Sequence, residues 1–127
     1  MRERNSPPDN ALFGAFVDGK LIGSTGLHRE EGMKDRHKAM IWGVYTAPEA
    51  REHGVGRALM MAAIDRAKTT PGIERLNLAV ATHNTAARNL YVSLGFTVWG
   101  LERHALKLPD GYIDEEYFAL ELDDSAS

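Results

Sequence analysis

The stretch that decides the fold is Arg51-Glu52-His53-Gly54-Val55-Gly56-Arg57-Ala58, near the middle of a chain of 127 residues. An apolar, strand-like run at residues 40–44 precedes it, and a helix-like run at residues 58–68 follows it. The two glycines let the backbone turn and pass close to a bulky ligand, because they carry no Cβ. The first amides of the following helix have no partner inside the helix and lie at the positive end of its dipole. A strand, a glycine loop and a helix in this order predict a ligand that is held by its phosphates.

Two better-known phosphate loops fit this stretch less well. A P-loop has Lys and then Ser or Thr after its second glycine, and here Arg57 and Ala58 follow. A Rossmann fingerprint needs a third glycine where this chain has Leu59. Taken alone, the loop leaves two interpretations open, a phosphate site and a plain turn that begins a helix.

A second marked element lies further along the chain, at residues 84–96. Asn84 is a good N-cap for a short helix, and Gly95 is the left-handed residue expected just beyond its C-terminus. One apolar face is formed at helical spacing by Ala87, Leu90, Tyr91 and Leu94. The ring of Tyr91 is therefore expected to be at least half-buried, and its hydroxyl needs a partner. Considered alone, such a tyrosine is more often a core residue than a catalyst.

The two patterns Arg51-x-x-Gly54-x-Gly56 and Asn84-x-x-Ala87-x-x-Leu90-Tyr91-x-x-x-Gly95-Phe96 together resemble the GNAT superfamily of N-acetyltransferases. They occur in the family's order with a strand between them, and the similarity runs from about residue 11 to residue 122. The resemblance implies an α/β fold of mixed α+β character, in which helices pack on a mixed sheet. It also implies that an acetyl group moves from acetyl-CoA, the cosubstrate, to a primary amine by direct attack.

The resemblance further implies roles for individual residues. The thioester carbonyl would lie against backbone amides near Val44, Tyr45 and Thr46, where an N–H group stabilises the oxyanion as it forms. The pyrophosphate would bind backbone amides of the loop Arg51, Glu52, His53, Gly54, Val55, Gly56, Arg57 and Ala58. Asn84 would contact the pantetheine arm, although a simple helix cap explains its position equally well. With the resemblance, the catalytic role of Tyr91 is favoured, as the general acid that protonates the leaving CoA thiolate.

The general base stays open. Many family members carry a glutamate on the strand ahead of the cofactor loop, but residues 39–44 contain no acid. Glu30, Glu31 and His37 are the nearby candidates, and a histidine titrates in the useful range. Each is more often a solvated surface group, and a water relay is an equal alternative. The 5 histidines show no HxH or HExxH spacing, so the sequence predicts no metal.

Composition agrees with one domain that spans residues 1–127. Apolar residues make up 43% and charged residues 26% of the chain, as in ordinary globular proteins. The net charge of -3, without a basic stripe, argues against a nucleic-acid surface. The absence of cysteine excludes disulfides and thiolate nucleophiles. No apolar run approaches the roughly 20 residues of a membrane span and no signal peptide opens the chain, so a cytoplasmic protein without a membrane partner is predicted.

The predicted elements begin with a hairpin and then alternate. Strands are expected at residues 11–17, 20–27, 38–46, 76–81, 96–103 and 112–122, and helices at residues 57–68 and after Asn84. The turns are Asp18-Gly19 and Pro109-Asp110-Gly111, and residues 28–37 read as a charged loop. The face of the first helix is predicted to consist of Leu59, Ala62, Ala63 and Ala67. Residues 1–10 and 123–127 are expected to be flexible.

The start of the chain differs from the family pattern. Family members usually begin with a strand and two helices, which form one wall of the acceptor site. Here Ser6-Pro7-Pro8-Asp9-Asn10 has the composition of a turn or coil, so the fold is predicted to lack those elements. An uncovered sheet edge and apolar face then predict a homodimer, with the hairpin at residues 11–27 or the last strands near the contact.

Two other functions remain as alternatives at this stage. The domain could bind acetyl-CoA or CoA without catalysis, or the glycine loop could hold another phosphate ligand such as a nucleotide. The acceptor is also open, since a small amine, an amino acid, an antibiotic or a protein N-terminus would each satisfy the pattern. The expected partner is therefore a small-molecule or peptide amine.

Overall fold

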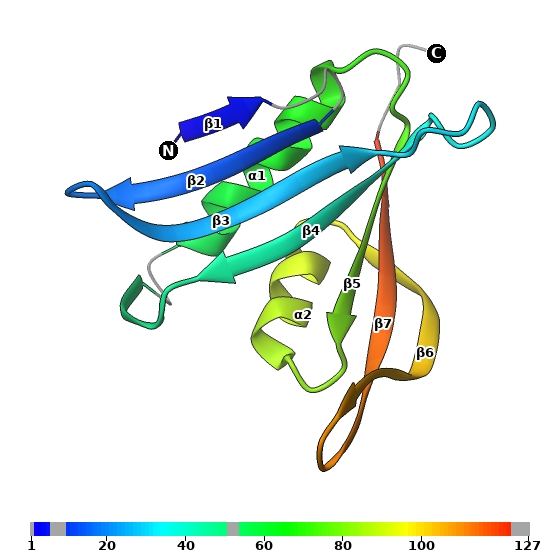
Figure 1. Ribbon diagram of the computed structural model, residues 1–127. Coiled ribbons are helices and arrows are strands. Elements are labelled where there is room, and N and C mark those ends of the chain that lie inside the picture. The colour runs from blue at the N-terminus through cyan, green and yellow to red at the C-terminus, as the bar shows by residue number, and fades with distance from the viewer. Residues whose placement is uncertain (1, 6–9, 51–53, 123–127) are drawn as a thin grey trace. The chain divides into compact units, whose positions relative to one another are not determined.

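The computed structural model describes residues 2–5, 10–50 and 54–122 of the chain (Figure 1). The chain forms two compact units, residues 1–76 together with 122–127, and residues 77–121. Strands and helices are mixed along the chain, which confirms the predicted α/β class. None of the helices in the described ranges is long and apolar enough to cross a membrane.

The first unit contains four antiparallel strands in the order β1-β2-β3-β4. Their bounds are β1 (Arg2–Asn5), β2 (Asn10–Val17), β3 (Lys20–Arg29) and β4 (Lys38–Thr46). The tight turn between β2 and β3 has Asp18 at φ 51° and Gly19 at φ 80°. Two successive left-handed residues are what a short hairpin turn of this kind requires, so the predicted Asp18-Gly19 turn is confirmed.

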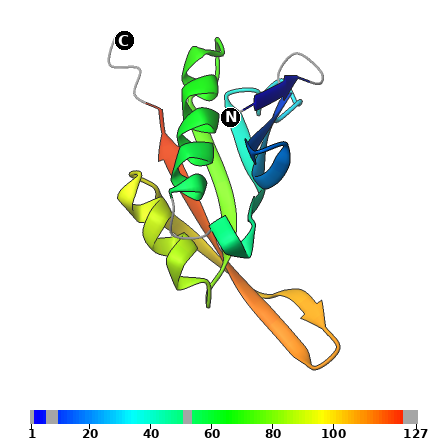
Figure 2. The same ribbon diagram turned by 90° about the vertical axis from the view of Figure 1, so that its left-hand side faces the viewer.

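One face of these strands is covered by a helix. The short 3₁₀ helix η1 (Pro48–Ala50) is followed by α1 (Val55–Thr69), which runs along β2, β3 and β4 (Figure 1). Figure 2 shows the same helix beside the strands after a quarter turn. Buried side chains alternate along the strands on this face, namely Ala11, Phe13, Thr25, Leu27 and Ile41. The apolar alternation predicted from the sequence therefore has α1 as its partner.

The predicted face of the helix is partly wrong. Leu59, Ala63 and Ala67 are buried as expected, but Ala62 is only half-buried. Met60 and Ile64 are buried in its place. A stripe at positions 59, 60, 63, 64 and 67 places the larger side chains against the strands, where they cover more apolar area than alanine would.

Two predicted strand bounds in the first unit are also corrected. Residues 2–5 form strand β1, where a flexible segment was expected, because their backbone pairs with the edge of β2 from Arg2↔Gly14 to Asn5↔Ala11. The strand β3 extends to Arg29, whereas the sequence placed His28 and Arg29 in a loop. The cause is again pairing, since β3 faces β2 through Asn10↔His28 and β4 through Arg29↔Ala39. Arg29 is buried and its Nε donates to the Arg36 carbonyl oxygen at 2.6 Å.

The second unit consists of a three-stranded arrangement in the order β5-β7-β6 and one helix. Its elements are β5 (Arg75–Ala81), which begins in the first unit, α2 (Thr85–Ser93), β6 (Thr97–Leu108) and β7 (Gly111–Glu121). Both predicted ends of α2 are confirmed. The Asn84 side chain accepts a hydrogen bond from the Ala87 amide at 3.1 Å, and Gly95 has φ 101°.

Candidate functional site

Strand β4 has a bulge where the thioester was predicted to bind. Gly26 of β3 lies opposite Trp42, but Ser24, two residues back, lies opposite Tyr45, so β4 uses one residue more than β3 over this interval. Gly43 has φ 63° in this interval, a conformation that side chains with a Cβ rarely adopt. The extra residue of a bulge takes no part in the ladder. The backbone at residues 43–44 is thus the place on β4 where an amide is left for another partner.

The predicted thioester residues flank this bulge. Val44 lies within it and is 37% exposed, while Tyr45 and Thr46 return to the ladder opposite Ser24 and Gly23. The structure therefore brings all three residues to one short segment at the end of β4. The glycine before them, Gly43, is the residue that makes the bulge possible, and the sequence reasoning did not single it out.

The glycine loop ends in the first turn of α1. Arg51, Glu52 and His53 lie outside the described residues. Gly54 is the N-cap, in the left-handed conformation at φ 79°, and its carbonyl accepts the first helical hydrogen bond, from the Ala58 amide at 3.0 Å. The amides of Val55 and Gly56 precede that bond and have no partner within the helix. No acidic residue lies in this first turn, so no side-chain charge there offsets the positive end of the dipole.

Gly23 of β3 lies close to both the start of α1 and the bulged end of β4. A Cβ at residue 23 would lie 2.8 Å from Val55 Cγ1, 2.9 Å from Leu59 Cδ1 and 3.0 Å from the Tyr45 carbonyl oxygen. Only glycine allows the first turn of α1 to approach β3 this closely. The predicted phosphate loop and the predicted thioester segment are therefore fixed next to each other within the first unit.

Tyr91 and Asn84 belong to the second unit. The Tyr91 ring is 4% exposed and lies between two other rings, with centroid distances of 6.1 Å to both Phe96 and Phe118. Burial raises the pKa of the Tyr91 hydroxyl above its ordinary value of 10.0, so the group stays protonated at neutral pH. A protonated phenol suits a proton donor, and the same packing also suits a core residue.

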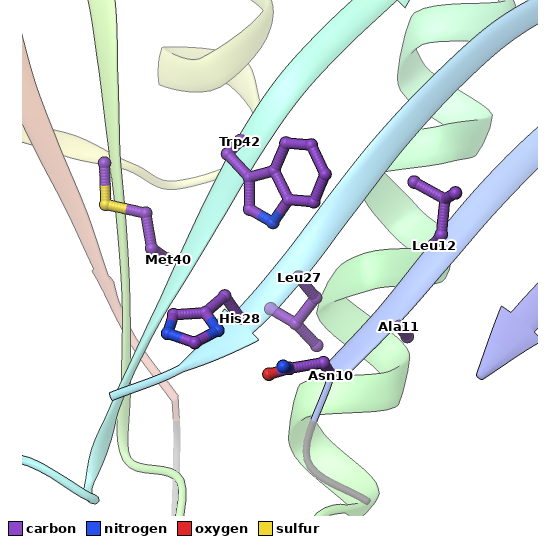
Figure 3. A pocket seen from close by; sticks show the side chains of 7 residues that line it. All are labelled: Asn10, Ala11, Leu12, Leu27, His28, Met40 and Trp42. Atoms are coloured by element: carbon purple, nitrogen blue, oxygen red, sulfur yellow. The ribbon is translucent and has the colours of Figure 1, made fainter. Parts of the chain in front are cut away.

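A cavity of about 570 Å³ opens on the face of β2–β4 that lies away from α1 (Figure 3). Its lining is mainly apolar and consists of Asn10, Ala11, Leu12, Leu27, His28, Met40 and Trp42. The indole of Trp42 lies against Gly26, because a Cβ there would be 2.2 Å from Trp42 Cε2. His28 lies opposite Met40 in the register of β3 and β4. The sequence reasoning missed this cavity, since it ended the strand at residue 27 and placed His28 in a loop.

The predicted bases lie elsewhere. Glu30 is half-buried just beyond the end of β3, and Glu31 and His37 are exposed in the loop before β4. None of the three lines the cavity. Over the described ranges, no group of three or more His, Cys, Asp or Glu side chains is placed to hold a metal ion.

The sequence of the chain matches a known family over three quarters of its length. The model of the acetyltransferase (GNAT) family matches residues 1–96. The chain belongs to the GNAT acetyltransferase family. The resemblance stated from the two sequence patterns is thereby confirmed.

Individual GNAT relatives support the same assignment. The chain is 36% identical over 93 residues to the mycothiol acetyltransferase of Thermobispora bispora, which covers 72% of this chain and 31% of that protein. It is 32% identical over 101 residues to N-alpha-acetyltransferase 40 of Saccharomyces cerevisiae, covering 69% of this chain and 34% of the relative. The chain therefore spans about a third of the length of these curated relatives.

Solved structures agree with the fold. A GCN5-related N-acetyltransferase from Kribbella flavida superimposes with a TM-score of 0.81 at 32% identity, over 94% of this chain and 71% of that one. The acetyltransferase yncA of Salmonella typhimurium, described as putative and solved with its cofactor acetyl-CoA, gives a TM-score of 0.82 at 24% identity. That match covers 93% of this chain and 68% of that one, and at this identity it supports the fold alone.

Proposed function

We propose that this protein transfers an acetyl group from acetyl-CoA to a primary amine by direct attack of the amine on the thioester. One observation carries the proposal: the β4 bulge at Gly43 and the first turn of α1 lie side by side in one unit, held together by the close approach at Gly23. The bulge offers a backbone amide to a carbonyl oxygen, and the helix start offers amides to phosphates. Membership of the GNAT family supports the pairing of these two features.

The cofactor would lie along this part of the first unit. Its pyrophosphate would bind amides of residues 51–58, and its thioester carbonyl would lie against the amides of Val44, Tyr45 and Thr46. Asn84 would contact the pantetheine arm in addition to capping α2. No metal has a role in this scheme, because backbone donors stabilise the developing oxyanion.

Tyr91 would protonate the CoA thiolate as it leaves. The raised pKa of its hydroxyl supports the assignment, because the proton is held until the thiolate forms. The demand on this acid is modest, since an ordinary thiol has a pKa of about 8.5 and can depart partly as thiolate. The packing of Tyr91 against Phe96 and Phe118 would hold the phenol in one orientation.

Gly56→Val tests the cofactor site. The added side chain in the first turn of α1 should obstruct the approach of a pyrophosphate, and acetyl-CoA binding measured by calorimetry should weaken by several kcal/mol, on the order of 10²-fold or more in Kd. Met61→Val, at a position on the same helix that is 44% exposed, is the matched control and should bind normally. Unchanged binding by a folded Gly56→Val protein would remove the pyrophosphate assignment.

Turnover of acetyl-CoA with a panel of amines tests the reaction itself. Acetylation of any amine, followed as CoA thiol release and confirmed by product mass, is the expected result. Tight binding of acetyl-CoA without amine-dependent turnover would instead identify a CoA-binding domain, and displacement of CoA by ATP would identify a nucleotide site. The panel includes small molecules and peptides, in keeping with the names of the two relatives.

We also propose a homodimer located in the cytoplasm, without nucleic-acid or membrane partners. Exposed apolar side chains on the first hairpin support the assembly, with Val17 54% and Leu21 43% exposed. The last strands contribute a second such surface through Trp99 at 60% and Leu101 at 53%. Surfaces of this kind are commonly covered in an assembly.

A further inference from the structure

We propose that the cavity on the open face of β2–β4 receives the amine acceptor, and that His28 in its wall takes the proton from the amine. The proposal rests on the acetyl transfer proposed above and adds to it a base and a class of acceptor. Neither was expected from the sequence, where the candidate bases were Glu30, Glu31, His37 and water.

The cavity lies beside the part of β4 that leads into the bulge. Trp42 lines it and is the residue directly before Gly43 of the bulge. A molecule that rests against the indole therefore contacts the residue directly before the backbone that is proposed to hold the thioester carbonyl. The cavity volume of about 570 Å³ is within the range of small-molecule sites. An acceptor in the cavity is thus placed next to the acetyl group.

His28 lies on the same face of the sheet as Met40 and Trp42. It faces Met40 directly across the strands, and Trp42 is therefore its diagonal neighbour, at a Cα distance of about 7–8 Å in a regular antiparallel pair. Gly43 lies three residues beyond Met40 along β4, about 10 Å at about 3.4 Å per residue, so an amine nitrogen at the bulge would pass its proton to the imidazole through water. Among the described lining residues, His28 carries the kind of side chain that most often serves as a general base.

The charged groups around His28 are few. Glu30, just beyond the end of β3, lies two residues after His28 and on the same face of the sheet. From β4, the corresponding group is Lys38, whose ammonium is paired with Asp35 at 3.1 Å. From β2, residues 10–17 contribute no titratable side chain. None of the described lining residues is a carboxylate, so none of them pairs with the imidazole.

The lining also defines the class of acceptor. The apolar part of the lining includes Leu12, Met40 and Trp42, and none of the described lining residues is a carboxylate that could hold a cation. Asn10 Oδ1 accepts a hydrogen bond from the Arg29 amide at 3.1 Å, which fixes the carboxamide at the rim. Such a site favours a primary amine with an apolar or aromatic body, whose ammonium group is deprotonated on binding.

The chemistry balances with these groups. Neutral His28 takes one proton from the ammonium and becomes imidazolium, which leaves a free amine. The nitrogen lone pair forms the new C–N bond to the acetyl carbonyl carbon, and the C–S bond to CoA breaks as the carbonyl reforms. The nitrogen loses its second proton to solvent, and the thiolate takes the proton of Tyr91, which solvent then restores. The products are the amide and CoA, and His28 returns its proton to solvent.

His28→Asn tests the proposal with 2-phenylethylamine as the acceptor probe. The variant cannot take up a proton near neutrality, so kcat/KM for this amine at pH 7 should fall on the order of 10²-fold, while acetyl-CoA binding is unchanged. The acid limb of the wild-type pH profile should disappear from the variant, and added free imidazole should restore part of the rate. The control is His104→Asn in β6, where the residue is exposed at φ 55°, a conformation that asparagine tolerates well.

The outcomes separate this inference from the function on which it rests. If the wild-type protein acetylates no amine, the proposed function fails. If it does acetylate amines but His28→Asn keeps the rate and pH profile of His104→Asn, the His28 assignment is overturned and the transferase remains. His28→Gln is the second variant and carries the same expectation if the asparagine variant does not fold. A kcat/KM for 2-aminoethanol equal to that for 2-phenylethylamine would overturn the assigned acceptor class.

Discussion

Gly26→Ala should change the shape of the proposed acceptor cavity without removing any of the side chains that line it. A Cβ at residue 26 would lie 2.2 Å from Trp42 Cε2, 2.4 Å from Cζ2 and 2.7 Å from Nε1. All three separations are shorter than van der Waals contact permits. The indole therefore has to leave the surface of β3, and since it forms a wall of the cavity, the cavity changes shape.

The cost in stability follows from the area that the indole covers. Trp42 is 50% exposed, so about half of its side chain is in contact with the protein. For a ring that buries about 150–250 Å² when fully covered, this is about 100 Å², or about 2.5 kcal/mol at about 25 cal/mol per Å². Alanine in place of glycine in a strand regains about 0.5–1 kcal/mol. We expect a net loss of about 1–2 kcal/mol in the free energy of unfolding, because the displaced indole keeps some contacts.

The assays are urea unfolding and steady-state kinetics with 2-phenylethylamine. We expect KM for this amine to rise about tenfold, corresponding to about 1.4 kcal/mol, with little change in KM for acetyl-CoA. Gly100→Ala in β6 is the matched control, because the nearest atoms to its new Cβ lie at 3.9 Å, and it should leave both KM values unchanged. An unchanged KM for the amine in a Gly26→Ala protein of lowered stability would refute the link between this cavity and the acceptor.

Gly23→Ala should push the first turn of α1 away from β3, because the Tyr45 carbonyl at 3.0 Å from the new Cβ cannot rotate away. We expect the free energy of unfolding to fall by about 1–3 kcal/mol and acetyl-CoA binding to weaken. Normal acetyl-CoA affinity in calorimetry would contradict this. Tyr91→Phe keeps the ring contacts and should lower kcat by roughly tenfold to a few hundredfold with little change in KM for acetyl-CoA. The pKa of Tyr91 is raised in the folded protein, so its share of the stability is complete below pH 10 and is lost as pH rises from there toward the folded pKa. Tyr91→Phe should therefore flatten the fall in stability above pH 10, and an identical pH dependence would show that the hydroxyl keeps its ordinary pKa. Sedimentation at micromolar concentration should show a homodimer, and a single monomeric species would contradict the assembly.

Local rules were enough to predict several elements from the sequence. Asp18-Gly19 specifies a tight turn because two successive left-handed residues are accessible there, and the flanking alternation specifies its strands. Asn84 and Gly95 mark the ends of α2, since each satisfies the backbone groups of its own helix end. The strand at residues 38–46 was predicted with its correct bounds. In each case the interactions that decide the conformation lie within a few residues along the chain.

The features of the candidate site depend instead on which strand residues lie opposite each other. The pairing of residues 2–5 with β2 makes a strand of a segment that was expected to be flexible. The pairing of Asn10 with His28 makes a predicted loop residue part of the cavity lining. The β4 bulge at Gly43 exists only relative to the register of β3, and the need for glycine at residue 23 appears only when α1 lies against it. A shift of one residue in register reverses the face of every side chain in a strand, so no local pattern could place these groups. The sequence therefore identified the family and predicted a cofactor loop, and the packing of strands from distant parts of the chain placed the cavity and His28.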